Sequence, residues 1–215
     1  MHAVLLGATG ATGSDLLNLM INDDAFKRID IFVRRDVSVR HEKLRIHIVN
    51  FDAPEQWAHQ VQGDVLFSCL GTTLKTAGSK AAQWKVDYDY QFAFAKAAVT
   101  NKINHYVLVS AAMASPDAFF FYPKMKGALE KAVEELGFEK LDIFRPPLLI
   151  RKHTSRAGEK IAYPILRMLN RMGLFGSQKP MPTERLAKAM IEVAKRKEAG
   201  TRIHTALMIH ARTEM

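Results

Sequence analysis

The stretch Gly7-Ala8-Thr9-Gly10-Ala11-Thr12-Gly13 decides the fold that this sequence predicts. It directly follows an apolar run at residues 2–6 and opens an amphipathic segment at about 12–22, so we predict a turn between a strand and a helix. Glycines at every third position permit a tight turn, and a helix N-terminus offers free N–H groups to an anion. We therefore expect the pyrophosphate of a dinucleotide to bind here, and the alternative is a turn that only connects the two elements. The predicted phosphate-binding residues are Gly7, Thr9, Gly10, Ala11, Thr12 and Gly13.

The rest of the chain repeats this strand-then-helix rhythm. The alternation predicts βαβ units and a parallel sheet. Runs such as Tyr106-Val107-Leu108-Val109 are apolar on both faces, as expected when helices cover both sides of the sheet. We predict an α/β fold with a Rossmann-type doubly wound parallel sheet in three αβα layers. The expected strands lie at about 2–6, 29–33, 45–49, 64–69, 105–110 and 141–145, and the expected helices near 12–22, 54–61, 84–101 and 122–137.

The C-terminal part departs from this rhythm. Residues 151–183 are basic and contain three prolines, so we expect a small irregular segment that covers the substrate side of the site. A final helix is predicted at about 183–197 with Thr183 as N-cap, followed by a strand from Ile203 to Met208. A length of 215 residues favours a single NAD(P)-binding domain over residues 1–215, which includes the basic segment.

The net charge of +9 is concentrated at one end of the chain. Residues 1–150 contain 17 basic and 17 acidic residues, whereas residues 151–215 contain 14 basic and 5 acidic ones. A concentrated positive field attracts a phosphorylated cofactor, an acidic small-molecule substrate or an acidic protein partner, although it is also compatible with a solvated surface. The basic part lacks regularly interleaved aromatic residues, which argues against nucleic-acid binding.

Composition and cysteine content narrow the class further. The longest apolar runs are too short to cross a bilayer and no cationic leader precedes the first strand, so we expect a cytoplasmic protein without a membrane partner, either a monomer or a homodimer. The single cysteine, Cys69, forms no internal disulfide, and its apolar neighbours favour a buried strand residue over a reactive thiol. No metal site is expected.

The ends of the second and third predicted strands bear on the choice of dinucleotide. The second strand runs into Arg34-Arg35, and two guanidiniums at this point suit the 2′-phosphate of NADP(H). Asp36 follows and could hold the ribose hydroxyl of NAD(H) instead. We predict NADP(H) over NAD(H). Asp52, after the third strand, is predicted to accept a hydrogen bond from adenine, although an aspartate there is equally common as a turn residue or helix cap.

Three residues form a candidate catalytic set. Tyr122 and Lys126 stand four apart in a predicted helix, so their side chains share one face. An ammonium beside a phenol favours the phenolate, so Lys126 is expected to lower the pKa of Tyr122. Ser110, at the end of the fifth strand, could hydrogen-bond the same substrate oxygen while a hydride moves between substrate and nicotinamide. The alternative is that Tyr122 is a boundary aromatic and Lys126 a solvated helix residue.

With these residues in place, the sequence resembles the atypical or extended short-chain dehydrogenase/reductases. It is most similar to the Tat-interacting-protein-like NAD(P)-binding oxidoreductases, over about residues 2–150. The resemblance implies an NADPH-binding Rossmann fold with a Ser-Tyr-Lys triad, in which Leu70 and Gly71 line the cofactor, Lys126 holds the nicotinamide ribose and Pro146 flanks the nicotinamide. The matching motifs are Cys69-Leu70-Gly71-Thr72-Thr73, Val86-Asp87-x-Asp89-Tyr90, Tyr122-x-x-x-Lys126-Gly127 and Phe144-Arg145-Pro146.

One position departs from the family pattern. Related proteins often carry an asparagine that helps to relay protons, and Asp87 occupies that place here. An acid could still hold a water, but it puts efficient turnover in question. Two functions therefore stay open. The favoured one is an NADPH-dependent reductase of a small carbonyl substrate, and the alternative is a non-catalytic NADPH-sensing regulator whose basic C-terminal third contacts a partner.

Overall fold

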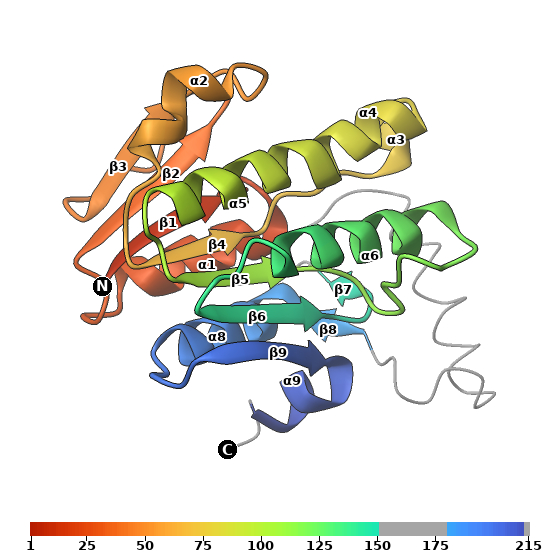
Figure 1. The fold of residues 1–215 in the computed structure, drawn as a ribbon. Coiled ribbons are helices and arrows are strands. Elements are labelled where there is room, and N and C mark those ends of the chain that lie inside the picture. Colours follow the sequence, from red (N-terminus) through yellow and green to blue (C-terminus); the bar gives the residue numbers. More distant parts are fainter. Residues whose placement is uncertain (151–179, 213–215) are drawn as a thin grey trace.

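The computed structural model describes residues 1–150 and 180–212 of the chain. Its centre is a seven-stranded sheet in the order β3-β2-β1-β4-β5-β6-β9, and every pair of neighbouring strands is parallel (Figure 1). The predicted Rossmann-type parallel sheet is therefore confirmed. The strands are β1 (His2–Leu6), β2 (Arg28–Val33), β3 (Leu44–Ile48), β4 (Val65–Ser68), β5 (His105–Val109), β6 (Lys140–Arg145) and β9 (Gly200–Thr205), and a separate two-stranded sheet pairs β7 (Leu149–Ile150) with β8 (Met181–Pro182).

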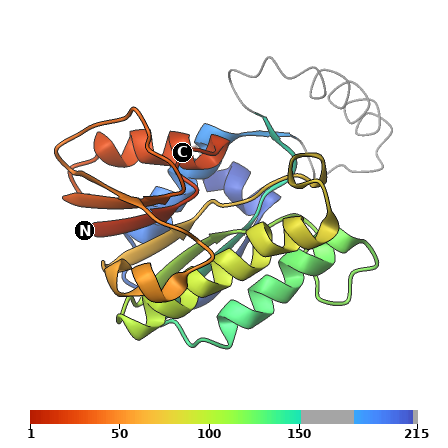
Figure 2. The same cartoon turned by 90° about the horizontal axis from the view of Figure 1, so that it is seen from above.

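The chain reverses its direction across the sheet between β1 and β4. It first runs outward from β1 to β3 and then crosses back to β4 on the other side of β1. Helices cover both faces of the sheet, as Figure 2 shows from above. Ligands of open α/β sheets bind at the carboxyl ends of the strands beside such a reversal. The helical elements are α1 (Ala11–Ile21), α2 (Pro54–Trp57), η1 (Ala58–Gln60), α3 (Leu74–Ala77), α4 (Lys80–Trp84), η2 (Lys85–Asp89), α5 (Tyr90–Thr100), α6 (Phe121–Glu134), α8 (Thr183–Ala194) and α9 (Ala206–Arg212).

Two apolar cores lie on the two faces of the sheet. In β1, Ala3 and Leu5 join the core that α1 and α8 cover, while Val4 and Leu6 join the core beneath α5 and α6. Alternate residues of a strand point to opposite faces, so a strand buried on both sides must be apolar throughout. This explains why the strand runs in the sequence show no polar alternation.

The C-terminal elements differ from the prediction in two ways. The last strand is β9, which ends at Thr205, and residues 206–212 form α9, so the second half of the strand predicted from Ile203 to Met208 is wrong. Thr183 is not the N-cap of α8, because Pro182 holds that position and the Thr183 hydroxyl donates to Asp15 of α1 at 2.6 Å. Both errors arise from tertiary contacts that local sequence signals do not report.

The segment predicted to cover the substrate lies largely outside the described residues, which resume at residue 180. Across residues 1–150 and 180–212, the helices are too short or too polar for any of them to cross a bilayer.

Candidate functional site

A pocket of about 590 Å³ opens at the carboxyl edge of the sheet. The turn after β1, the loops after β4, β5 and β6, the first turns of α6 and the start of α8 all contribute to its walls. The predicted site residues that line this pocket lie up to 136 positions apart in the sequence. They meet here because the strands of a parallel sheet end along one edge. The predicted site residues that line it are Gly10, Ala11, Thr12, Leu70, Gly71, Ser110, Tyr122, Lys126 and Pro146.

The glycines of the turn have two different roles: Gly7 and Gly13 permit close backbone packing, and Gly10 leaves the helix N-terminus open to a ligand. Gly7 has a φ of 87°, and a Cβ on it would lie 2.6 Å from the Cys69 backbone, while a Cβ on Gly13 would lie 2.1 Å from the Gly7 carbonyl oxygen. These two glycines therefore permit close packing and do not line the pocket. Gly10 is the N-cap of α1 and supplies no side-chain cap, so the first N–H groups of the helix are open to an anion. Thr9 is exposed on the same turn.

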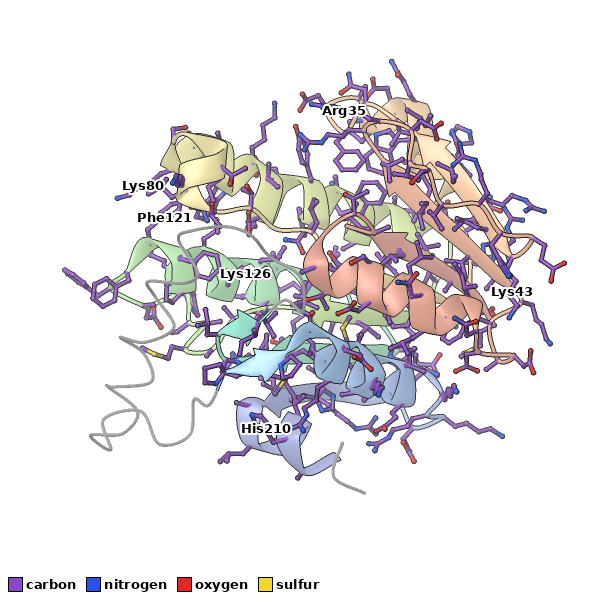
Figure 3. The ribbon with its side chains drawn as sticks, turned by 180° about the vertical axis from the view of Figure 1, so that it is seen from behind. Arg35, Lys43, Lys80, Phe121, Lys126 and His210 are labelled. Carbon is purple, nitrogen blue, oxygen red and sulfur yellow. The ribbon has the colours of Figure 1, made fainter. Side chains whose placement is uncertain are left out.

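Arg34 and Arg35 lie outside the pocket, in the exposed stretch after β2 (Figure 3 labels Arg35). Among the described residues, neither guanidinium forms a hydrogen bond or an ion pair. Asp36, by contrast, accepts two hydrogen bonds from Arg40, at 2.8 and 3.0 Å. The residue that would hold a ribose hydroxyl is therefore engaged, whereas the two residues predicted to hold a phosphate are available.

Asp52 lies after β3 and also outside the pocket. Its Oδ1 accepts from Lys85 Nζ at 2.7 Å and from the Tyr90 hydroxyl at 2.8 Å. The hydrogen bond from Lys85, followed by that from Tyr90, lowers the pKa of Asp52, so the carboxylate is ionised. Its Oδ2 keeps the capacity to accept a further hydrogen bond, which is compatible with the adenine contact predicted from the sequence.

Helix α6 places the two helical members of the candidate catalytic set. Tyr122 lines the pocket and is 41% exposed. Lys126, labelled in Figure 3, is only 2% exposed and donates from Nζ to the Val109 carbonyl oxygen at 3.0 Å. Lys126 is therefore no solvated helix residue. Gly127 allows α6 to pack closely on the loop after β5, because a Cβ there would lie 2.1 Å from the Ser115 backbone. The helix is also tied to β6, since Arg145 Nε donates to Glu130 at 3.1 Å.

Ser110 completes the set from the end of β5. It is 5% exposed, it lines the pocket, and its Oγ has no hydrogen-bond partner among the described residues. Its backbone N–H donates to Phe144, which fixes its position beside β6. Buried hydroxyls without partners are uncommon in folded proteins, so this oxygen is available to a ligand.

The electrostatics of the pocket differ from the prediction. Burial raises the pKa of Tyr122 to about 12, and the Asp87 carboxylate adds to the effect. Burial also lowers the pKa of Lys126, against the opposing influence of Asp87 and Glu130. The expectation that Lys126 lowers the pKa of Tyr122 is therefore wrong for this structure, because desolvation disfavours both charged forms. The phenol is protonated at neutral pH and can serve as an acid.

Asp87 belongs to the pocket, although its sequence position predicted only a departure from the family pattern. The residue is fully buried and lines the pocket. Its Oδ2 accepts from the Thr72 N–H at 2.8 Å, while Oδ1 has no partner among the described residues. Burial raises its pKa, against the opposing charge of Lys126. The sequence signal for this role was the motif Val86-Asp87-x-Asp89-Tyr90.

Three other pocket residues carry little chemistry of their own. Cys69 follows β4 and is half-buried, so it is not the buried strand residue that was predicted. Desolvation of its thiol raises the pKa to about 12, so the thiol is inert at neutral pH, as predicted. Thr183 lines the pocket from the start of α8, and no local signal could place it there because it arrives from the far end of the chain. Pro146 is held by a hydrogen bond from the Ala112 N–H to its carbonyl oxygen.

The open helix N-terminus at Gly10 fits the phosphates of a dinucleotide, and the unpartnered oxygens of Ser110 and Asp87 leave polar groups available to a ligand in the same pocket. Comparison with known proteins agrees. Residues 7–155 match the family described as NAD(P)H-binding. The chain is 35% identical over 163 residues to Protein HTATIP2 of Rattus norvegicus, covering 74% of this chain and 67% of that protein. It is 32% identical over 203 residues to Protein FMP52, mitochondrial, of Candida albicans, covering 91% and 89%.

Among solved structures, the fold is similar to that of MoeE5 in complex with UDP-glucuronic acid and NAD. The TM-score is 0.73 at 13% sequence identity, over 96% of this chain and 76% of that one. At this identity the likeness concerns the fold alone. Together with the sequence matches, it confirms the predicted Rossmann fold and the resemblance to Tat-interacting-protein-like oxidoreductases.

The expectation of a cytoplasmic location is contradicted by the names of several relatives. The matching fungal FMP52 proteins are described as mitochondrial. That expectation rested on the lack of a recognisable leader and of a long apolar run, and neither feature determines in which compartment a folded domain of this kind works.

Proposed function

The chain belongs to the NAD(P)H-binding, Tat-interacting-protein-like family of short-chain dehydrogenase/reductase-like oxidoreductases, and we propose that it is an NADPH-dependent reductase of a small carbonyl substrate. The observation that carries the proposal is that Ser110, Tyr122 and Lys126 line one pocket together with the open N-terminus of α1. An acid, a hydrogen-bond donor and a buried cation beside a phosphate site are the groups that carbonyl reduction requires.

When bound, the dinucleotide supplies the hydride that reduces the carbonyl carbon. Tyr122, whose raised pKa keeps the phenol protonated, donates its proton to the carbonyl oxygen as negative charge develops there. Ser110 Oγ donates a hydrogen bond to the same oxygen and orients it. Lys126 binds the nicotinamide ribose, because Nζ uses only one hydrogen bond within the described residues, to Val109.

The preference for NADPH over NADH rests on the stretch after β2. Arg34 and Arg35 are exposed and available, and forked guanidinium donors match the oxygens of a 2′-phosphate. Asp36, which would favour a ribose hydroxyl, is held by Arg40. A free carboxylate at this point would also repel the phosphate. The Asp36–Arg40 pair therefore favours NADPH in two ways, because it engages the acceptor of a ribose hydroxyl and it offsets the negative charge near the phosphate.

A second candidate is a non-catalytic NADPH-binding regulator. The observation that favours it is the pKa of Tyr122, which burial raises to about 12 and which no neighbouring cation brings down. A phenol of this kind is a weak acid, and a buried carboxylate stands beside the lysine that should activate it. In this alternative the pocket senses NADPH, and the basic C-terminal third contacts an acidic protein partner.

The two candidates are separated by binding and turnover measured on the same preparations. NADPH is titrated by its fluorescence, and oxidation of NADPH is then followed with a panel of aldehydes and ketones. The test variant is Tyr122→Phe, and the matched control is Tyr88→Phe, which removes the hydroxyl of a tyrosine outside the pocket. We expect Tyr122→Phe to bind NADPH normally and to lose about 10²-fold or more in kcat, while the control keeps both. Tight NADPH binding without turnover on any substrate would support the regulator.

A further inference from the structure

Glu130 is a buried acidic residue that the proposed function does not use. It lies on α6 one turn after Lys126, is only 5% exposed, and shares the buried face of the helix with Leu129 and Val133. Glutamate is rarely buried without a partner, because an ionised carboxylate loses its hydration there. The cost of burying Glu130 therefore indicates a specific partner.

That partner is Arg145, the last residue of β6. Its Nε lies 3.1 Å from Glu130 Oε1 and its Nη2 lies 2.5 Å from Oε2, so two donors of the guanidinium meet both carboxylate oxygens. Forked pairs of this kind hold both side chains in one orientation. The pair connects the helix that carries Tyr122 and Lys126 to the strand end that leads into Pro146. It therefore joins two walls of the pocket.

Lys126 is attached to the neighbouring strand in turn. Its Nζ donates to the Val109 carbonyl oxygen at the end of β5, and the Ser110 N–H donates to the Phe144 carbonyl oxygen of β6. Residues one helical turn apart share a face of the helix, so Lys126 and Glu130 both meet the sheet from the same side of α6. The ion pair therefore helps to fix where Lys126 stands relative to the strand ends.

Charged and titratable groups from three parts of the structure face Lys126. Glu130 on its own helix and Asp87 of η2 both favour the protonated amine, which burial opposes. Cys69, in the loop after β4, also interacts with it, and Tyr122 lies one turn earlier on α6. The two carboxyl groups differ in their surroundings. Burial raises the pKa of Asp87, whereas Glu130 accepts charge-assisted hydrogen bonds from a guanidinium.

We propose that Glu130, held by Arg145, is a positioning residue for Lys126 that keeps the buried amine charged and in place to bind the nicotinamide ribose; this inference rests on the proposed function. A charged amine is the stronger donor to a ribose hydroxyl, and a negative charge one turn away favours that state. Because Arg145 engages both oxygens of Glu130, the carboxylate takes no hydrogen bond from Nζ, whose remaining donors serve the ribose.

The first test measures the ionisation of Lys126 without cofactor or turnover. Proteins with carbon-13 at the lysine Cε are titrated by NMR from about pH 6 to 11, and Lys126→Met identifies the signal. We expect the Lys126 midpoint to move to lower pH in Glu130→Gln, because the amide keeps the size of the side chain and removes its charge. Glu134→Gln, which removes an exposed carboxylate one turn further along α6, is the control and should leave the midpoint in place. Equal midpoints in the parent and Glu130→Gln would overturn the inference.

The second test separates the charge of Glu130 from its structural contacts. In Glu130→Leu/Arg145→Met, apolar side chains replace the whole ion pair, so denaturant unfolding should show a stability close to that of the parent. The Lys126 midpoint should nevertheless move to lower pH, as in Glu130→Gln. A double variant with the stability and the midpoint of the parent would show that the pair is only structural, and would overturn the inference.

The third test is the dependence of NADPH affinity on pH. The Kd should rise as Lys126 loses its proton, and in Glu130→Gln this rise should begin at lower pH. Between the two midpoints the variant should bind NADPH about tenfold more weakly than the parent, and well below them equally tightly. A Kd raised by the same factor at every pH would contradict the role of the charge. Turnover of Tyr122→Phe tests the proposed function separately, so the failure of one can be told from the failure of the other.

Discussion

The two ends of the proposed dinucleotide site hold the same kinds of charged side chain in opposite environments. At the adenosine end, Arg34, Arg35 and Asp52 are exposed to solvent. At the nicotinamide end, Asp87 and Lys126 are buried, and desolvation shifts both pKa values toward the neutral forms. The exposed end can therefore bind a ligand through fixed charges, whereas the side chains at the buried end can gain or lose protons more readily.

Replacing Lys126 with methionine should have the largest effect and tests the buried end. The variant Lys126→Met keeps the side-chain volume and removes the ammonium, so kcat should fall by about 10²- to 10⁴-fold. Stability should not fall, because burying an apolar isostere avoids the cost of desolvating a cation. Steady-state kinetics and denaturant unfolding measure the two quantities. Lys124→Met, on the same helix but outside the pocket, is the control, and an equal loss of activity there would contradict the role of Lys126.

Removing the two arginines should weaken NADPH binding specifically. In the double variant Arg34→Ala/Arg35→Ala, the Kd for NADPH should rise roughly 10- to 100-fold, since each charge-assisted hydrogen bond to phosphate is lost. The Kd for NADH should change little, because NADH lacks the 2′-phosphate. Fluorescence titration with both nucleotides measures the difference. Arg45→Ala, in β3, serves as control, and a parallel loss of NADPH and NADH affinity would argue against a phosphate site here.

Asp142 extends the comparison to a buried carboxylate that has partners. His105 Nε2 lies 2.8 Å from its Oδ2 and His204 Nε2 lies 2.6 Å from its Oδ1. Although burial opposes ionisation, these hydrogen bonds lower the pKa of Asp142 to about 2. A lowered folded-state pKa contributes stability that is present above the unfolded value of 3.8 and is lost as pH falls through about 2.

Asp142→Asn should therefore cost on the order of 2 kcal/mol of unfolding free energy at neutral pH, and the cost should shrink below about pH 4. Asp87→Asn should show the opposite sign, because burial raises the pKa of Asp87 and its ionised form destabilises the fold at neutral pH. Denaturant unfolding of both variants at pH 7 and pH 3 measures the difference. Equal losses of unfolding free energy for the two variants at pH 7 would mean that hydrogen-bond partners do not determine how much a buried carboxylate costs the fold.

The smallest effect is expected at the exposed adenosine end. Lys85 and Asp52 form an ion pair at 2.7 Å, and their side chains are 50% and 49% exposed. Exposed pairs of this kind contribute little, so Lys85→Ala should leave the unfolding free energy almost unchanged. Thermal and denaturant unfolding provide the measurement. A clear loss of stability would show that the exposed end contributes to the fold as well as to recognition.

Much of the fold could be predicted because its signals are local. Each of these signals involves only residues that are close together in the sequence. They are the apolar run at residues 2–6, the glycine turn after it and the four-residue spacing of Tyr122 and Lys126. The C-terminal strand covers Gly200–Thr205 and not the predicted range because β9 pairs with β6, and Thr183 is not the N-cap because its hydroxyl donates to Asp15 of α1. Contacts between distant parts of the chain decided both cases.

The sequence by itself determined the residue types and the spacing of the proposed site: a glycine turn after the first strand, two arginines after the second, and a serine, a tyrosine and a lysine near the ends of central elements. Only the tertiary structure decided in what state those groups work. It engages Asp36 with Arg40, buries Lys126, raises the pKa of Tyr122 to about 12 and leaves one oxygen of Asp87 without a partner. The reason is physical, because residue types and spacing follow the chain, whereas desolvation and charge coupling depend on everything that packs around a group.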